Sequence, residues 1–309
     1  MSAAAPELPL TPPRPPDAPL SYRLGRRASE YARLMRLDKP VGTWLLLWPA
    51  LWALWIAGEG RPTPRVLIVF VLGVVVMRAA GCVINDFADR NIDPYVRRTR
   101  DRPLAARRVA PLEALLLFVL LLAVALYLVT RLDLLTIKLA CIGAALTVSY
   151  PFLKRVFPMP QLYLGISFGG WSVPMAFAAQ RGTLPRVAWV LYLAAVIWAA
   201  LYDTIYAMVD REDDLKIGVK SSAILFADMD RFLIGVMQLM MLYALVLVGR
   251  SMQFGRWYHA GVLAAAVLFL RQQWLIRRRE PGGCLRAFVN NQYVGLVVFV
   301  GILLQYVYA

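Results

Sequence analysis

The sequence predicts an all-α, polytopic membrane protein with nine transmembrane helices. Hydrophobic residues make up 60% of the 309 residues, and the mean hydropathy is +0.59, whereas a soluble domain is about 45–50% apolar. The excess is concentrated in blocks of about 20 residues, the length of a helix that crosses a bilayer. Several blocks also begin with a proline, which is favourable in the first turn of a helix.

The N-terminal region differs from the rest of the chain. Its first 20 residues include prolines 6, 9, 12, 13, 15, 16 and 19, so we expect a disordered tail over residues 1–25 and a transmembrane domain over 26–309. Residues 21–38 place tyrosines and leucines among arginines, a pattern typical of an amphipathic helix on the membrane surface. An ordinary basic segment beside the membrane fits this pattern nearly as well. No early apolar segment is present, so we expect no cleavable signal peptide.

The predicted spans are separated by short links. Residues 131 and 132 alone connect the third span to the fourth, so these two should form an antiparallel hairpin. Acidic motifs end the second and sixth spans, which suggests two pseudo-repeats of about four helices and an added ninth helix. The nine predicted spans are 41–58, 65–87, 111–130, 133–150, 160–179, 186–208, 231–249, 257–276 and 288–308.

Positive charge is distributed unevenly between the two sides of this arrangement. The formal net charge is +15, and about 24 of the 34 lysines and arginines fall on one side. That side holds the N-terminal arm and the loops at 88–110, 154–155, 209–230 and 277–279. Because loops rich in Lys and Arg stay in the cytoplasm, both acidic motifs should open on the cytoplasmic side.

The first acidic motif comprises Asn85, Asp86, Asp89 and Asp93. With about 3.6 residues in each turn, the three aspartates fall within roughly 60° of one another, on one helical face. Pro94 disfavours a helical conformation in the residue before it, so the helix should end near Asp93. Like charges on one face repel each other, and hard divalent cations with oxygen ligands are suited to lie between them.

The second motif repeats this arrangement about 120 residues later. Asp203, Asp210 and Asp214 fall within roughly 40° of one another on a helix, and Lys216 and Lys220 follow them. The first motif is likewise followed by arginines, of which Arg98 and Arg102 are one helical turn apart. A ligand that requires both metal ions and basic side chains is polyanionic, and a diphosphate is the obvious candidate.

Four further polar residues leave two interpretations open. Arg78 shares a helical face with Asp89, so it either pairs with the acidic cluster or reaches a substrate anion. Tyr150, Lys154 and Arg155 close the fourth span. They form either an interfacial belt with snorkelling cations or an anion site for a second, carboxylate-bearing substrate.

The two motifs and their flanking residues resemble the UbiA superfamily of intramembrane aromatic prenyltransferases over about residues 30–305. The likeness rests on the two acidic motifs, on Arg98-Thr99-x-x-Arg102-Pro103-Leu104 and on Gly218-x-Lys220-Ser221. It extends to the stretches MRLDKPVGTWLLLWP (35–49), SYPFLKR (149–155), GWSVPMAFAA (170–179) and YDTIYAMVDREDD (202–214). The Pro-rich N-terminal tail lies outside it.

The resemblance implies nine helices around a central cavity, two Mg²⁺ ions, and a polyprenyl diphosphate donor that enters from the lipid bilayer. It implies that 4-hydroxybenzoate is the acceptor and that the product is a ubiquinone precursor. We expect a bacterial inner membrane rather than a mitochondrial one, because the N-terminus is too Pro-rich for a typical amphipathic transit peptide. One metal would be held by Asn85, Asp86, Asp89 and Asp93 and the other by Asp203, Asp210 and Asp214, with Asp89, Asp93, Asp210 and Asp214 as the catalytic set. Diphosphate would bind Arg90, Arg98, Arg102, Lys216 and Lys220, and the acceptor would bind Arg155, Lys154, Tyr150 and Arg78.

Two other function classes remain as alternatives. A related enzyme would use another aromatic acceptor, such as a naphthoate or homogentisate. A cation-coupled transporter would place carboxylates near the middle of the membrane without neighbouring basic residues, whereas here the acids lie at helix ends beside arginines. Nine apolar spans exclude a soluble prenyl synthase. The three cysteines and single histidine are too few and too scattered for a disulfide framework or a zinc site.

Overall fold

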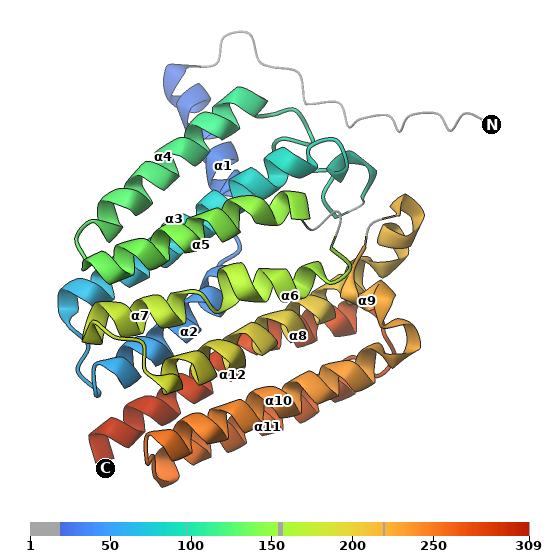
Figure 1. Ribbon diagram of the computed structural model, residues 1–309. Helices are drawn as coiled ribbons and strands as arrows, with labels where there is room; N and C mark the ends of the chain where they lie inside the picture. The colour runs from blue at the N-terminus through green and yellow to red at the C-terminus, as the bar shows by residue number, and fades with distance from the viewer. Residues whose placement is uncertain (1–18, 97, 154–156, 219, 309) are drawn as a thin grey trace. The chain divides into compact units, whose positions relative to one another are not determined.

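The computed structural model describes residues 19–96, 98–153, 157–218 and 220–308, and this part of the chain is helical and contains no strand (Figure 1). The elements are α1 (Leu20–Leu34), α2 (Val41–Ala57), α3 (Pro64–Asp89), η1 (Asp93–Tyr95), α4 (Pro111–Val129), α5 (Leu134–Leu153), α6 (Pro160–Leu164), η2 (Gly165–Gly169), α7 (Ser172–Arg181), α8 (Arg186–Ile217), α9 (Ser222–Leu225), η3 (Ala227–Met229), α10 (Asp230–Ser251), α11 (Arg256–Leu275) and α12 (Pro281–Tyr308).

A helix occupies each of the nine predicted positions. Seven helical segments among the described residues are long and apolar enough to cross a membrane: α3, α4, α5, the α6–α7 segment, α8, α10 and α12. The other two positions are taken by α2, which has 17 residues, and α11, which is more polar. The chain is therefore a multi-pass membrane protein, and the count of nine spans stays a prediction.

The N-terminal helix covers most of the segment, residues 21–38, that was predicted to be an amphipathic helix. α1 starts at Leu20, inside the predicted tail of residues 1–25; residues 1–18 lie outside the described part of the chain. The predicted amphipathic character is present, because Leu24 and Tyr31 share one face of the helix. Arg23, Arg26 and Arg33 share another.

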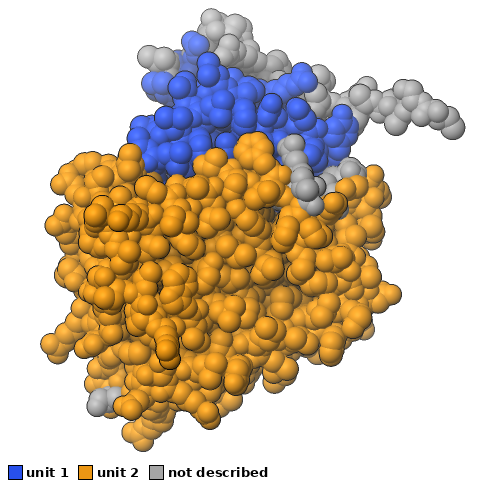
Figure 2. Space-filling model, viewed as in Figure 1, with its two compact units in different colours: residues 1–40, 76–124 blue, residues 41–75, 125–309 orange. Residues whose placement is uncertain are grey.

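The chain divides into two compact units, distinguished by colour in Figure 2. Unit 1 comprises residues 1–40 and 76–124, and unit 2 comprises residues 41–75 and 125–309. The division falls inside α3 and α4. The small core of unit 1 joins α1, the last turns of α3, the basic loop and the start of α4. Its buried residues are Leu34, Ala80, Val83, Ile84, Leu104, Val109, Ala114 and Phe118.

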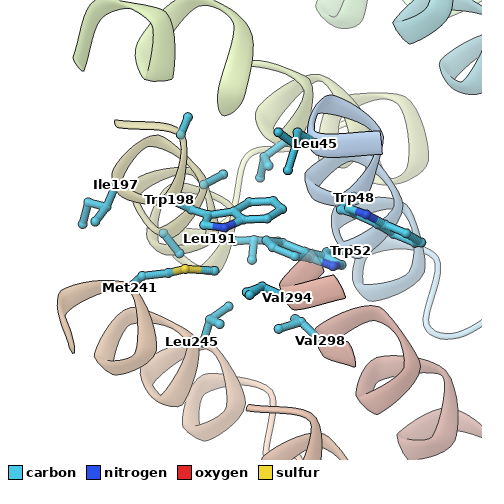
Figure 3. Packing of buried hydrophobic residues seen from close by; sticks show 14 of the residues in the cluster. Leu45, Trp48, Trp52, Leu191, Ile197, Trp198, Met241, Leu245, Val294 and Val298 are labelled. Atoms are coloured by element: carbon cyan, nitrogen blue, oxygen red, sulfur yellow. The ribbon is translucent and has the colours of Figure 1, made fainter. Parts of the chain in front are cut away.

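Unit 2 is built around long helices that pack lengthwise. α12 packs against α2, α8 and α11, and α10 packs against α8 and α11 (Figure 1). At the centre the rings of Trp52 and Trp198 stack with centroids 5.1 Å apart (Figure 3). Each indole N–H is satisfied on α12, by the Gly295 carbonyl at 3.0 Å and the Asn291 side-chain oxygen at 3.0 Å. These bonds matter in an apolar environment, where an unpaired donor is costly.

The fifth predicted span is interrupted. α6 passes into the π-helical turn η2, in which the Gly170 N–H donates to the Gly165 carbonyl. Gly165 and Gly169 lie so close to α8 that an added Cβ would meet the Val196 carbonyl oxygen at 2.5 Å and the Ala199 methyl group. Small residues allow helices to approach closely where no hydrophobic effect drives their association. The turn therefore fixes α6 and α7 against α8.

Candidate functional site

The first acidic motif lies partly on a helix and partly beyond it. α3 ends at Asp89, and Asp93 begins the 3₁₀ turn η1, so the prediction of one helix continuing to Asp93 was wrong by about one turn. Pro94 has no N–H to bond the Arg90 carbonyl, which removes a bond that a continuing helix would need. The chain tightens instead, and the Ile92 N–H donates to the Asp89 carbonyl at 2.8 Å.

Asp86 is held between two arginines of unit 1. Its side chain is 1% exposed. Arg36 Nη2 donates to both carboxylate oxygens, at 2.8 and 2.9 Å, and Arg102 Nη1 donates to Oδ1 at 3.1 Å. Arg36 follows α1 with a φ of 58°, a left-handed conformation that is unfavourable for an L-residue with a side chain. This strained backbone position accompanies an ion pair in which one guanidinium nitrogen contacts both oxygens of a buried carboxylate.

Arg102 also reaches Asp93. Its Nη1 lies 2.9 Å from Oδ2 and 3.2 Å from Oδ1 of that carboxylate. Burial raises the pKa of Asp93 to about 6; Arg102 acts in the opposite direction, and Asp89 and Asp86 add to the rise. The pKa of Arg102 is raised, because its two carboxylate partners outweigh its burial. Burial thus dominates at Asp93, and a further cation would favour the ionised carboxylate.

The remaining residues predicted in unit 1 are half-buried or exposed. Asn85 Nδ2 donates to Asp89 Oδ2 at 3.2 Å, so the two side chains meet one turn apart. Arg90 donates to the Phe87 carbonyl and lies over its ring. Arg98 is exposed. Arg78, of which two interpretations were open, donates to Cys82 Sγ at 2.7 Å.

The second motif lies wholly on α8. This helix extends to Ile217 and ends at Gly218, whose φ of 71° is favourable for glycine. Asp203, Asp210 and Asp214 therefore keep helical spacing and share one face, as predicted. All three are half-buried. The helix continues about two turns beyond the predicted span of 186–208, and Asp210 and Asp214 lie on these added turns whereas Asp203 lies within the span.

A hydrogen-bonded chain fixes the loop after α8 within unit 2. Thr204 Oγ1, next to Asp203, lies 2.7 Å from Ser222 Oγ. The Ser222 N–H donates to the Gln161 side-chain oxygen at 2.9 Å, and Ser221 caps α9. Lys220 immediately precedes these residues and is exposed, as is Lys216. The loop that carries Lys220 is thereby attached to the helix that carries Asp203.

The predicted acceptor residues are only partly described. Tyr150 stacks on Tyr163 with ring centroids 6.3 Å apart and meets Phe168 edge-on. Tyr163 Oη in turn lies 2.7 Å from Ser149 Oγ. Lys154 and Arg155 lie outside the described residues, so their predicted contact with an acceptor carboxylate is untested.

The donor groups fit a hard divalent cation by their chemistry, since Asp and Asn oxygens are the ligands that Mg²⁺ accepts. Within the described ranges, no three His, Cys, Asp or Glu side chains converge closely enough to bind one ion. In unit 1 the reason is visible: Asp86 and Asp93 are directed to Arg102.

Arg36 and Gln161 both contact motif segments, although no role was predicted for either residue. Arg36 lies in the quoted stretch MRLDKP, just after an amphipathic helix, and this position beside the membrane surface was the available signal. Gln161 offered a weaker signal, because it is a polar side chain in the first turn of an apolar span. Neither position reveals its partner, because the contacts join residues 50 and 61 positions apart.

Comparison with known proteins gives close relatives. Residues 46–308 match the UbiA prenyltransferase family. The chain is 58% identical over 283 residues to a 4-hydroxybenzoate octaprenyltransferase of Methylococcus capsulatus, covering 92% of this chain and 97% of the relative. It is 56% identical over 279 residues to a protein of the same name from Alkalilimnicola ehrlichii, covering 90% and 95%.

Solved structures show the same fold. A UbiA homologue from Aeropyrum pernix K1, in its apo form, matches with a TM-score of 0.75 and 22% identity, covering 85% of this chain and 98% of the homologue. A homologue from Archaeoglobus fulgidus bound to GPP and Mg²⁺ matches with a TM-score of 0.68 and 17% identity, covering 89% and 99%. From the matched residues and the two bacterial relatives at 58% and 56% identity, the chain belongs to the UbiA prenyltransferase family.

Proposed function

We propose that the chain transfers a polyprenyl group from a polyprenyl diphosphate to the ring carbon ortho to the hydroxyl of 4-hydroxybenzoate. The observation that carries this proposal is the identity of 58% over 283 residues with a 4-hydroxybenzoate octaprenyltransferase. The relatives' name favours a donor with eight isoprene units. The product, a 3-polyprenyl-4-hydroxybenzoate, is a precursor of ubiquinone.

The diphosphate of the donor binds the basic residues that follow each motif, which we assign as Arg90, Arg98, Arg102, Lys216 and Lys220. Lysine and arginine form charge-assisted hydrogen bonds with phosphate oxygens. The exposure of Arg98, Lys216 and Lys220 supports this role, because an anion from solution reaches them. As negative charge grows on the departing diphosphate, these side chains stabilise it.

Asn85, Asp89 and Asp93 would hold one Mg²⁺ ion, and Asp203, Asp210 and Asp214 would hold a second. When bound, Mg²⁺ supplies further neutralisation of the leaving group. The resemblance to the family placed Asp86 in the first set as well. Its carboxylate lies between two guanidinium groups, so we assign it to holding Arg36 and Arg102.

The reaction forms one carbon–carbon bond. The allylic C–O bond of the donor breaks, and the electron pair leaves with pyrophosphate. The ring carbon ortho to the phenol attacks the allylic cation, and the ring proton passes to an aspartate of the motifs or to the released pyrophosphate. Asp89, Asp93, Asp210 and Asp214 are the residues that we expect to be essential for these steps.

The acceptor carboxylate binds near the end of α5, where Tyr150 stands and Lys154 and Arg155 follow. Arg78 is the remaining candidate for this contact. The apolar helices accommodate a polyprenyl chain that is insoluble in water, while the charged motifs stay at the interface. The bacterial origin of the relatives favours an inner-membrane location. The excess of Lys and Arg on the motif side supports an orientation in which both motifs face the cytoplasm.

Pyrophosphate release from purified protein tests the proposal. A long-chain prenyl diphosphate is supplied, with 4-hydroxybenzoate and Mg²⁺ each present or omitted. We expect release only with both additions, and none from Asp89→Ala or Asp210→Ala. Asp101→Ala and Glu212→Ala are matched controls, because both side chains are exposed acids beside the motifs, and they should retain activity.

Two outcomes would redirect the proposal. Release that needs Mg²⁺ but not 4-hydroxybenzoate would keep the diphosphate site and transfer the acceptor role to another aromatic compound. No release under any condition, together with cation flux in proteoliposomes, would favour the transporter.

A further inference from the structure

Asp230, the first residue of α10, is a buried acid outside both motifs. It is 0% exposed. Its carboxylate accepts hydrogen bonds from Arg279 Nε at 3.0 Å to each oxygen and from Arg279 Nη2 at 2.8 Å. Arg211 Nη1 lies 3.3 Å from Oδ2. A carboxylate at a helix N-terminus is also stabilised by the helix dipole. Asp230 therefore joins two arginines to the start of α10.

Arg279 adopts a specialised conformation for this contact. It lies in the corner between α11 and α12 with a φ of 56°, in the left-handed region that is strained for a residue with a Cβ. Its Nη2 also donates to the Asp228 carbonyl at 2.7 Å, and its hydrogen bond with Asp230 raises its pKa. The corner after α11 is thus fixed to the start of α10.

Arg211 connects Asp230 to α8, the helix that carries the second acidic motif. It immediately follows Asp210 on α8, and it points about 80° around the helix axis from the mean direction of Asp203, Asp210 and Asp214. An ion pair between Arg211 and α10 therefore sets the rotation of α8 as well as its position. Because Arg211 is directed to Asp230, the face of α8 that carries Asp203, Asp210 and Asp214 points about a quarter turn away from α10.

The end of α8 needs such a restraint for electrostatic reasons. Residues 210–214 carry four acids within the last turns of the helix, where the negative end of the helix dipole disfavours them. Their mutual repulsion also favours fraying of the helix end. The pairing of Arg211, Arg279 and Asp230 carries a net charge of +1 and includes a residue of α8 itself, so it opposes both effects.

We propose that Asp230, with Arg211 and Arg279, is a positioning group that holds the Asp210–Asp214 turns of α8 in the orientation needed to bind metal and diphosphate. This inference rests on the proposed function for the identity of the ligands. The orientation of α8 itself does not depend on that function. The group is distinct from the motifs, since none of its three residues belongs to the predicted metal or diphosphate set.

The test uses Asp230→Asn and Arg211→Gln in the full-length protein. Arg211→Gln removes the link to α8 and leaves Arg279 paired with Asp230, so it remains informative where Asp230→Asn does not fold. Glu280→Gln and Arg278→Lys are matched controls, because both are exposed side chains of the corner between α11 and α12.

The first readout is hydrogen exchange, which needs no substrate. Both variants should exchange the amides of residues 208–217 faster than the wild type, while residues 190–200 of the same helix stay unchanged. The second readout is Mn²⁺ binding followed by electron paramagnetic resonance. We expect about 10–100-fold weaker binding, the usual effect of losing a residue that orients a metal ligand.

The double variant separates positioning from general stability. If Arg211 acts through Asp230, Arg211→Gln combined with Asp230→Asn should weaken Mn²⁺ binding no more than the more severe single change. Unchanged exchange at 208–217 in both single variants would overturn the proposal. A wild-type protein that releases no pyrophosphate would count against the proposed function alone, because the exchange comparison holds without it.

Discussion

Asp86 offers a quantitative test of the geometry in unit 1, through Asp86→Ala. The carboxylate is 1% exposed, and the side chains of Arg36 and Arg102 are 16% and 17% exposed. Removing one partner of a buried ion pair costs about 3–5 kcal/mol, because an uncompensated charge remains. In this variant Arg102 still pairs with Asp93 at 2.9 Å. Arg36 is therefore the side chain that loses its carboxylate partner. We therefore expect a loss near the lower end, about 3 kcal/mol.

The free energy of unfolding is measured by titration with SDS in mixed micelles, with EDTA present so that bound metal does not contribute. Arg36→Met combined with Asp86→Leu should recover much of the loss, because an apolar pair leaves no charge buried. Asp101→Ala is the control: its pair with Arg100 is exposed and 4.0 Å long, so it should cost less than about 1 kcal/mol. A loss at Asp86 as small as that at Asp101 would refute the argument from burial.

Three further predictions concern unit 2 and the metal. Gly169→Ala should destabilise the protein by about 1–3 kcal/mol in the same unfolding assay, because the added methyl group meets Ala199. Gly73→Ala is the control: a methyl group there meets no other atom, so this change should stabilise the protein by about 0.5–1 kcal/mol. Glu59→Gln should change the free energy of unfolding by less than about 1 kcal/mol, because Glu59 is 76% exposed opposite Arg181; a larger loss would contradict the exposure. EDTA should abolish pyrophosphate release and excess Mg²⁺ should restore it, and release that persists in EDTA would argue against a metal-dependent reaction.

Local periodicity predicted the parts of the fold that depend on short spacing. The apolar blocks located a helix at each expected position, and the spacing of Asp203, Asp210 and Asp214 predicted one face of what is α8. The same rule failed at Asp93, because the missing N–H of Pro94 acts on the preceding turn and ends α3 at Asp89.

Contacts between distant residues were beyond such reasoning. Nothing in the spacing of Arg36 or Arg279 indicates that each meets a buried aspartate, 50 and 49 residues away. Both arginines occupy left-handed positions just after a helix, a conformation that sequence patterns reveal for glycine but not for arginine. The interruption at η2 was equally hidden, because glycines and apolar residues fit an unbroken helix.

The π-helical turn has a consequence for insertions and deletions. A turn closed by a bond from residue 170 to residue 165 holds one residue more than an α-helical turn. Deleting that extra residue would convert the turn to an α-helical one, and the segments on both sides would keep roughly their present directions. A deletion in an unbroken α-helix would instead rotate everything after it by about 100°. Trp171, whose Nε1 donates to the Leu139 carbonyl at 2.8 Å and which lies against Gly143, would therefore keep its partners only if the deletion falls inside η2. This span can thus change its length by one residue at η2 without losing the packing that follows.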